Sequence, residues 1–339
     1  MMNNIERIKE LTAELLQHCH NYYVLDNPTI SDAEYDRKYN ELENLENEAN
    51  FWLTNSPTRQ VQGEVLPYLE KVHHSVPMLS ADKSTHIEDV KKFIGNNAVV
   101  SSFKLDGSTV VLKYKDGQFY QGLSRGSGTD GENITHTVKM IKNLPMTIPY
   151  HGYLEIRGEA VIPWEYYNEM NKDGSFGHPR NVASGGLRQL NAKEAANRNI
   201  YFYAFTLVNW KDIGVKTKQE SLTFLQNNGF DVVPHILCST QETAIRSVVT
   251  LDRKCFDIPT DGWCFEINDL ELGESMGSTE HHDRRMYALK PAIEEHATIF
   301  RGVEYNTCRT GIVSLTALFD HMISISSRLY FLYSSLSCA

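Results

Sequence analysis

Hydrophobic residues in the first fifty positions follow the spacing of two helices. The apolar residues of the first helix recur every three or four positions, at Ile5, Ile8, Leu11, Leu15 and Cys19. A second helix is predicted to begin after Pro28, because Ser31 and Glu34 stand in the relation of a capping box. The two segments together predict a helical hairpin.

One face of the second predicted helix combines carboxylates with an aromatic ring. Asp32, Tyr35 and Asp36 lie at positions i, i+3 and i+4, next to a predicted loop that contains Tyr22 and Tyr23. A solvated acidic face with buried aromatic residues is one interpretation of this spacing. A pocket for a cationic aromatic group is the other, and the spacing alone leaves both open.

From about residue 95 the pattern changes to short runs of alternating polar and apolar residues, which are typical of strands. Two such runs flank Lys115-Asp116-Gly117 and predict a hairpin, and "GYLEIRGEAVI" and "NIYFYAFTLV" predict further strands. Helices are expected at 163–171 and 217–228. The pattern as a whole predicts an α+β fold with a largely antiparallel sheet.

Composition limits the classes of protein that this chain can be. Its 339 residues are 41% hydrophobic and 22% charged, which is enough for a packed core and favours more than one domain. The six cysteines contain no CxxC pair, so neither a zinc site nor a disulfide framework is predicted. No apolar N-terminal region and no membrane-length run is present, and the predicted location is the cytoplasm.

A net charge of −10 at first argues against a nucleic-acid partner, since phosphate binding depends on Lys and Arg. The charge is unevenly distributed, however. Residues 1–50 hold eleven acidic and four basic side chains, a local net charge of −7, which leaves −3 for the other 289 residues. The acidity therefore belongs mostly to the helical segment.

Lys104 interrupts a predicted strand at "SSFKLDGSTVVLKY", where an apolar residue would pack better. A lysine near other cations or in a desolvated site can lose its proton and attack phosphorus or a carbonyl group. Asp106, two residues on, projects from the same face of the strand, and Gly107 leaves room for a ligand. K-x-D-G alone is more often a surface turn.

Residues downstream favour the functional interpretation. Arg125 lies in the glycine-rich segment "SRGSGTDGENIT", Glu159 lies in "LEIRGEAVI", and Arg180 and Arg188 lie in "FGHPRNVASGGLRQLN". "TDGWCFEIND" and "YALKP" add the last two candidates, Asp261 and Lys290. Cations with acidic residues among them suit a phosphate chain and a metal ion, a pattern typical of nucleotidyltransferases.

The chain resembles the NAD-dependent DNA ligases of bacteria from about residue 5 to about residue 317. The segments that carry the resemblance occur in the family's order: "NYYVLDNPTISDAEYDRKYNEL", "NSPTRQV", "HSVPMLS", "KLDG", "LEIRGE" and "HPRNVASGGLRQLN". The resemblance implies a helical module that binds the nicotinamide mononucleotide (NMN) half of NAD, followed by an ATP-grasp-like nucleotidyltransferase core. The implied NMN-binding residues are Tyr22, Tyr23, Asp32, Tyr35 and Asp36.

The resemblance also implies a role for each core residue. Lys104 would attack the adenylyl phosphorus of NAD, form lysyl-AMP and expel NMN, with Mg²⁺ offsetting the phosphate charge. Asp106 and Glu159 would hold the ribose or a metal-bound water, and Lys290 would stabilise the transition state. The other implied nucleotide-binding residues are Ser80, Gly107, Arg125, Arg180, Arg188 and Glu266. No set of protein metal ligands is predicted.

Three positions depart from the family pattern. Ser102 replaces a usual Glu two residues before the lysine, Glu266 replaces a usual Lys, and Ser127 replaces a usual Asp. Positions 102 and 266 are both expected at the adenine edge, where one loses an acid and the other gains one. The two changes either compensate for each other or mark a loss of function.

The resemblance predicts four regions. These are an NMN-binding module at 1–68, an adenylation core at 69–293, the start of an oligonucleotide-binding (OB) fold at 294–319 and a divergent tail at 320–339. The remaining barrel strands, a zinc module, helix-hairpin-helix repeats and a BRCT domain are expected on a second chain, as in some phage ligases, unless the gene is truncated.

The expected function is therefore the adenylating subunit of a ligase that acts on nicked double-stranded DNA. A catalytically impaired NAD-binding remnant is the alternative from a different class, and an enzyme that seals nicks alone or modifies another nucleic acid is a third.

Overall fold

The computed structural model describes residues 2–23, 27–53, 55–58, 68–291, 299–307 and 313–319. The chain divides into two compact units, Met1–Lys290 and Pro291–Ala339, and each is described by itself. Within the described residues, no helix has the length and apolar character needed to cross a membrane.

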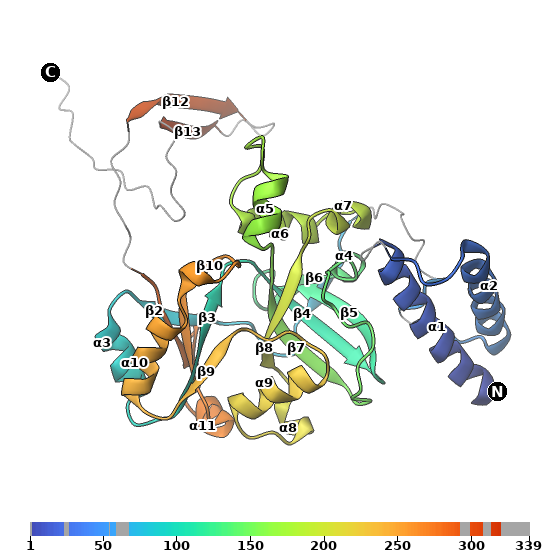
Figure 1. The fold of residues 1–339 in the computed structure, drawn as a ribbon, viewed down its shortest axis with the longest axis horizontal. Coiled ribbons are helices and arrows are strands. Elements are labelled where there is room, and N and C mark those ends of the chain that lie inside the picture. The colour runs from blue at the N-terminus through green and yellow to red at the C-terminus, as the bar shows by residue number, and fades with distance from the viewer. Residues whose placement is uncertain are drawn as a thin grey trace. The chain divides into compact units, whose positions relative to one another are not determined.

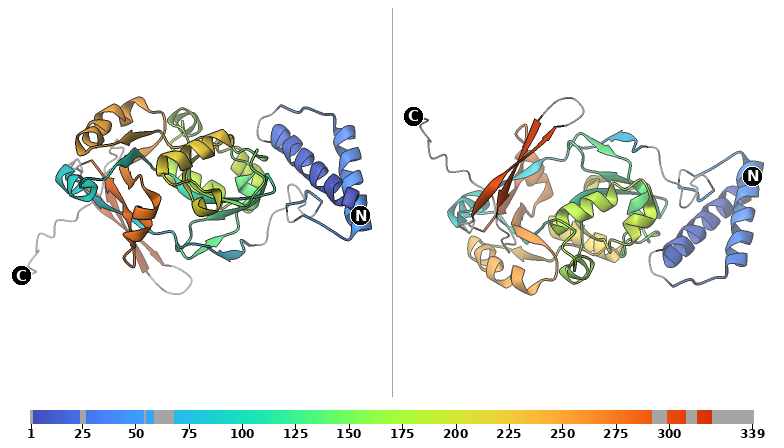
Figure 2. Two further views of the ribbon diagram at one scale, coloured as in Figure 1. Left: turned by 90° about the horizontal axis from the view of Figure 1, so that it is seen from below. Right: turned by 90° about the horizontal axis from the view of Figure 1, so that it is seen from above.

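The first unit begins with the predicted helical hairpin, α1 (Met2–Tyr23) and α2 (Asp32–Ala49), whose two helices run side by side (Figures 1 and 2). Its core consists of Ile8, Leu11, Leu15 and Leu42. The hydroxyl of Ser31 accepts a hydrogen bond from the backbone N–H of Glu34, which confirms the predicted start of α2. Tyr22 and Tyr23 belong to the last turn of α1, so their placement in a loop was wrong.

Two sheets form the centre of this unit (Figure 1). The five-stranded sheet has the order β2 (Ser80–Ser84), β11 (His282–Leu289), β10 (Thr260–Ile267), β3 (Val99–Leu105) and β9 (His235–Cys238). The four-stranded sheet has the order β5 (Gln118–Ser124), β4 (Ser108–Lys115), β7 (Leu154–Val161) and β8 (Tyr201–Leu207). Among the described strand pairs only β11 and β2 run parallel, which confirms the α+β fold with a largely antiparallel core.

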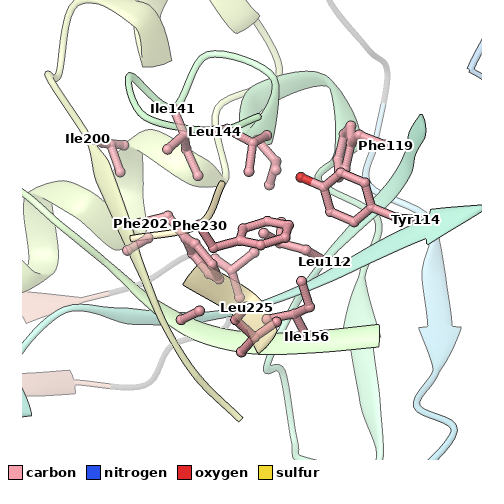
Figure 3. Packing of buried hydrophobic residues seen from close by; sticks show 14 of the residues in the cluster. Leu112, Tyr114, Phe119, Ile141, Leu144, Ile156, Ile200, Phe202, Leu225 and Phe230 are labelled. Atoms are coloured by element: carbon pink, nitrogen blue, oxygen red, sulfur yellow. The ribbon is translucent and has the colours of Figure 1, made fainter. Parts of the chain in front are cut away.

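Helices cover the outer faces of both sheets. The five-stranded sheet packs its apolar face against α3 (Ile87–Ile94) and α10 (Gln241–Thr250) through Val90, Ile94, Ala244 and Phe265. The four-stranded sheet packs against α6 (Pro179–Leu187) and α9 (Lys218–Asn227). Figure 3 shows this second core, where the ring of Tyr114 meets the rings of Phe119 and Phe230 edge-on. The expected helix at 217–228 is therefore confirmed.

Smaller elements complete the first unit. They are the two-stranded sheet of β1 (Lys71–His73) and β6 (Asp130–Glu132), together with the short helices α4 (Thr135–Val138), α5 (Trp164–Met170), α7 (Ala192–Ala196), α8 (Trp210–Ile213) and α11 (Leu270–Ser275). Helix α5 confirms the expected helix at 163–171.

The predicted hairpin is formed by β4 and β5. Its turn residues Asp116 and Gly117 have φ values of 53° and 78°, as a type I′ turn requires at both central positions. Along β3 the side chains alternate as predicted: Phe103 and Leu105 enter a core, whereas Ser102 and Lys104 lie on the other face of the sheet.

The second unit contains an antiparallel hairpin of β12 (Phe300–Thr307) and β13 (Val313–Phe319). This hairpin falls in the region where the start of an OB fold was expected. The predicted divergent tail, 320–339, lies outside the described residues. The predicted boundaries at residues 68, 293 and 319 stay predictions.

Candidate active site

Lys104 and Lys290 converge on one carboxylate although they belong to different strands. The Nζ atom of Lys104, on β3, lies 3.0 Å from Oδ1 of Asp261, and Nζ of Lys290, directly after β11, lies 2.6 Å from Oδ2. Asp261 is the extra residue of a β-bulge in β10, since Thr260 pairs with Leu105 and Gly262 pairs with the adjacent Lys104. The bulge turns the carboxylate towards both ammonium groups.

Asp261 stays ionised at neutral pH in this position. Burial by itself would raise the pKa of its carboxyl group, but the ammonium groups of Lys104 and Lys290 outweigh burial, and the pKa lies below its ordinary value. Both lysine side chains remain about one-third exposed. The two ammonium groups therefore share Asp261 as their counter-ion, and both remain accessible to an incoming anion.

Glu159 projects from β7 beside the end of β3. Its carboxylate accepts hydrogen bonds from the hydroxyl of Thr109 at 2.9 Å and from the backbone N–H of Gly107 at 3.3 Å. Burial raises the pKa of Glu159 to about 7, although Thr109, Lys104, Arg180 and Gly107 each oppose the increase. Glu159 can therefore change its protonation state near neutral pH, which is useful in a site that handles protons.

The packing of β7 requires a glycine at position 107. A Cβ atom at Gly107 would lie 2.2 Å from the carbonyl oxygen of Ala160 and 2.6 Å from a methyl group of Val161. The missing side chain therefore makes room for the backbone of β7. This close approach brings Glu159 within hydrogen-bonding distance of the loop after Lys104.

The predicted phosphate-binding arginines lie in three separate ion or hydrogen-bond pairs. Arg180 donates to Asp106 at 3.0 Å, which ties the start of α6 to the loop after β3. Arg125 donates to the hydroxyl of Ser80 at 2.9 Å, so these two predicted residues are neighbours. Arg188 instead forms a two-pronged ion pair with Glu132, at 2.7 and 2.8 Å, and it would have to exchange this partner to reach a phosphate.

Glu266 lies on the same face of the five-stranded sheet as Lys104, and we call this face the site face. Glu266 pairs with Val100 across β3, and Cys264 pairs with Ser102, so Ser102 and Glu266 are diagonal neighbours. The carboxylate of Glu266 is buried and forms an ion pair with Lys218, the first residue of α9. Lys218 was not among the predicted site residues.

The predicted NMN-binding residues lie at the end of α1 and the start of α2. The side chains of Tyr22 and Asp36 are exposed, and the hydroxyl of Tyr35 lies 3.0 Å from the sulfur of Cys19. The side chains of Tyr23 and Asp32 lie outside the described part of the structure.

Hydrogen bonds join this hairpin to the core. Gln118 donates to the carbonyl oxygen of Lys9 at 3.0 Å, and Nδ1 of His20 lies 3.2 Å from the carbonyl oxygen of Lys139.

The described residues contain no group of three or more His, Cys, Asp or Glu side chains that could hold a metal ion. Mg²⁺ does not require such a group, because it keeps several waters and is usually held by one or two carboxylates and the phosphates of a substrate. Besides Asp261, which is already paired with both lysines, Asp106 follows Lys104 by two residues and Glu159 accepts a hydrogen bond from Gly107, and these two carboxylates fit this mode of binding.

Two family models match the helical hairpin and the core that follows it. The model of the NAD-dependent DNA ligase adenylation domain matches residues 67–292, and the model of the DNA ligase-like N-terminal NAD⁺-binding domain matches residues 1–62. This chain belongs to the NAD-dependent DNA ligase family. The family predicted from the six sequence segments is thereby confirmed.

Curated relatives in this family are DNA ligases of bacteria. The DNA ligase of Lachnoclostridium phytofermentans is 37% identical over 94% of this chain and 50% of its own length, and that of Bacillus subtilis is 35% identical over 93% and 50%. The likeness to solved structures is lower: mycobacterial DNA ligase D complexed with ATP and MES gives a TM-score of 0.35 at 13% identity, over 63% of this chain and 60% of that one. The chain spans about half the length of the curated relatives it matches.

The three departures from the family pattern differ in their surroundings. Ser127 stabilises its own loop, since its hydroxyl accepts a hydrogen bond from the backbone N–H of Asp130 at 3.1 Å. Ser102 leaves a small, half-buried position on the site face. Only Glu266 introduces a charge that needs a partner, and Lys218 provides it.

Proposed function

We propose that this chain transfers the AMP group of NAD to Lys104 and releases NMN. The observation that supports the proposal best is the shared carboxylate: Lys104 and Lys290, each about one-third exposed, meet at Asp261, at the end of the site face and beside Glu159. Two ammonium groups at one accessible point suit the phosphates of a dinucleotide. Family membership supplies the identity of the dinucleotide.

In this proposal each residue acts at a stated place. Lys104 releases its proton to solvent and forms a P–N bond to the adenylyl phosphorus, while the P–O bond to the NMN phosphate breaks and NMN leaves. Lys290 stays beside that phosphorus and offsets the negative charge that develops on its oxygens. Mg²⁺, held by Asp106 and Glu159 through water, would add further positive charge there.

The surrounding residues would position the substrate. Arg180 and Asp106, which already contact each other, would hold the ribose and its phosphate, together with Ser80 on β2 and Arg125, which directly follows β5. Arg188 would release Glu132 to bind a phosphate. The exposed end of the helical hairpin would bind the NMN half through Tyr22, Tyr23, Asp32, Tyr35 and Asp36.

We further propose that the AMP passes from Lys104 to the 5′-phosphate at a nick in double-stranded DNA. The relatives are DNA ligases about twice as long as this chain, so the domains that hold DNA would come from additional sequence, and a second subunit is our proposal for its source. The proposed place of action is the cytoplasm of a bacterial cell, with or without phage.

Mass spectrometry of the purified chain after incubation with NAD and Mg²⁺ tests the first step. We expect the mass of one AMP to be added, and we expect ATP to be inactive in its place. A folded chain that binds NAD without forming the adduct would instead support the impaired-remnant alternative, to which the substitutions at Ser102 and Glu266 lend weight.

A further inference from the structure

Lys218 and Glu266 form a buried ion pair that the local sequence disfavours. The two residues are 4% and 8% exposed, the ammonium group also donates to the carbonyl oxygen of Phe205, and the second oxygen of Glu266 lies 3.8 Å from Nε of Arg285. Lys218 stands at the first position of α9, after the cap residue Thr217, where the helix dipole repels a cation. Because a buried ion pair adds little stability of its own, this pair is a candidate for a functional role.

The pair stands at one end of three rows of residues that cross the site face. The first row contains Lys104, Gly262 and Lys290, as the strand pairing and the contact between Gly262 and Lys290 indicate. The second row contains only small residues, Ser102, Cys264 and Ala288. The third row contains Val100, Glu266 and Met286.

This order of rows suits a nucleotide that lies along the strands. Four residues, or about 13 Å, separate the row of Lys104 from that of Glu266, and the small middle row leaves a flat floor between them. A phosphate at the lysine end would therefore place a planar base over Cys264. The polar edge of that base would face Glu266 and Lys218.

Each member of the pair offers one kind of hydrogen bond. Glu266 as a carboxylate only accepts, whereas the ammonium of Lys218 has three N–H donors, of which Glu266 and the carbonyl oxygen of Phe205 use two. Adenine presents an amino donor next to a ring-nitrogen acceptor. Hypoxanthine presents the reverse order, a carbonyl oxygen next to a ring N–H.

We infer that Lys218 is a specificity-determining residue, which together with Glu266 reads the donor and acceptor on the edge of the adenine ring. This inference rests on the proposed function, because that function supplies the dinucleotide. It assigns to α9 a part in substrate selection that strands β3 and β10 would not provide alone.

Exchanging the two charges tests the inference, because the double variant Lys218→Glu/Glu266→Lys keeps an ion pair and puts an acid at the start of α9, where the dipole favours it. We measure kcat/KM for adduct formation from NAD and from nicotinamide hypoxanthine dinucleotide. In the exchanged variant we expect kcat/KM for NAD, divided by kcat/KM for the hypoxanthine dinucleotide, to fall about tenfold or more. A change of this size is the effect of one hydrogen bond to a charged group. An unchanged ratio would overturn the inference, even if both values of kcat/KM fell by the same factor.

Two further measurements make the result unambiguous. The control is the same exchange at an exposed pair, Lys211→Glu/Glu274→Lys, whose partners are 60% and 55% exposed, and it should leave the ratio unchanged. Calorimetric binding of AMP and of inosine monophosphate repeats the comparison without chemistry, and should show the same shift in preference. If the unmodified chain forms no adduct, the proposed function fails, and the calorimetric preference still decides the role of Lys218.

Discussion

The Nζ atom of Lys104 lies 3.0 Å from Oδ1 of Asp261, and the same carboxylate is shared with Lys290. Asp261 therefore keeps one cation if the other is removed. The site can lose its proposed nucleophile without leaving a buried charge unpaired, a loss that is otherwise strongly destabilising. This makes Lys104 unusually suitable for a test by substitution.

Lys104→Ala should abolish the AMP adduct and leave the free energy of unfolding within about 1 kcal/mol of its original value, since Lys290 still pairs with Asp261. Lys104→Arg should be equally inactive, because a guanidinium stays protonated. Mass spectrometry and urea denaturation measure the two effects. Lys92→Ala, at an exposed side chain, is the control, and an adduct on the Ala variant would refute the assignment of Lys104.

Glu159→Gln should change the pH dependence of stability. The pKa of Glu159 is about 7 in the folded chain and 4.5 without the fold, so the folded state binds the extra proton and loses stability as pH rises between these values. At 1.36 kcal/mol per pH unit, the unmodified protein loses up to about 3 kcal/mol across this range that the Gln variant keeps.

Urea unfolding at a series of pH values from 4 to 8 measures this difference. Glu169→Gln is the matched control, because Glu169 is exposed on α5. Parallel stability curves for the Glu159→Gln variant and the unmodified protein would contradict the raised pKa.

Tyr22→Ala and Asp36→Ala should each reduce adduct formation from NAD at least about tenfold, while transfer of AMP from pre-adenylated protein to DNA in the presence of the partner stays unchanged. The reason is that these exposed side chains would contact only the NMN half. Stability should change by less than about 0.5 kcal/mol, as for most surface substitutions. Glu48→Ala, exposed on the same helix as Asp36, is the control, and efficient use of ATP by the unmodified chain would be inconsistent with this role.

Glu266→Lys should destabilise the fold by roughly 3–5 kcal/mol and impair adenylation, because two ammonium groups would then share a buried site with Lys218. Adding Ser102→Glu should recover part of both losses, since residues 102 and 266 are diagonal neighbours on adjacent strands. A double-mutant cycle measures the coupling. Additive effects would show that the two positions are independent.

The sequence predicted the surroundings of Lys104 better than those of Glu266. Strand periodicity and short motifs placed Lys104 and Glu159 on the strands β3 and β7 that the structure contains, whereas Asp106, predicted on the same strand as Lys104, lies directly after the end of β3. The reason for Gly107 could not be predicted, because it depends on the backbone of β7, more than fifty residues away. For the same reason the partner of Arg188 was not predicted.

Lys218 was missed although its local sequence held a signal. Its capping box predicts the start of α9, and a lysine at the first helical position opposes the dipole, which is an inconsistency worth following. Its partner Glu266 comes 48 residues later on a strand of the other sheet, so no periodicity connects the two. Long-range pairing of this kind appears only when the sheets are assembled.

Strand β10 lies between β3 and β11, and its bulge inserts one extra residue, Asp261, opposite β3. Deleting one residue there would restore an unbroken ladder between β10 and β3 and turn the carboxylate at position 261 to the opposite face of the sheet, leaving both lysines without their common anion. The sheet would keep its hydrogen bonds and its hydrophobic faces beyond the deletion point. The loss of one codon at this bulge would therefore remove the shared anion and place a carboxylate against the apolar side chains of Phe103 and Leu105.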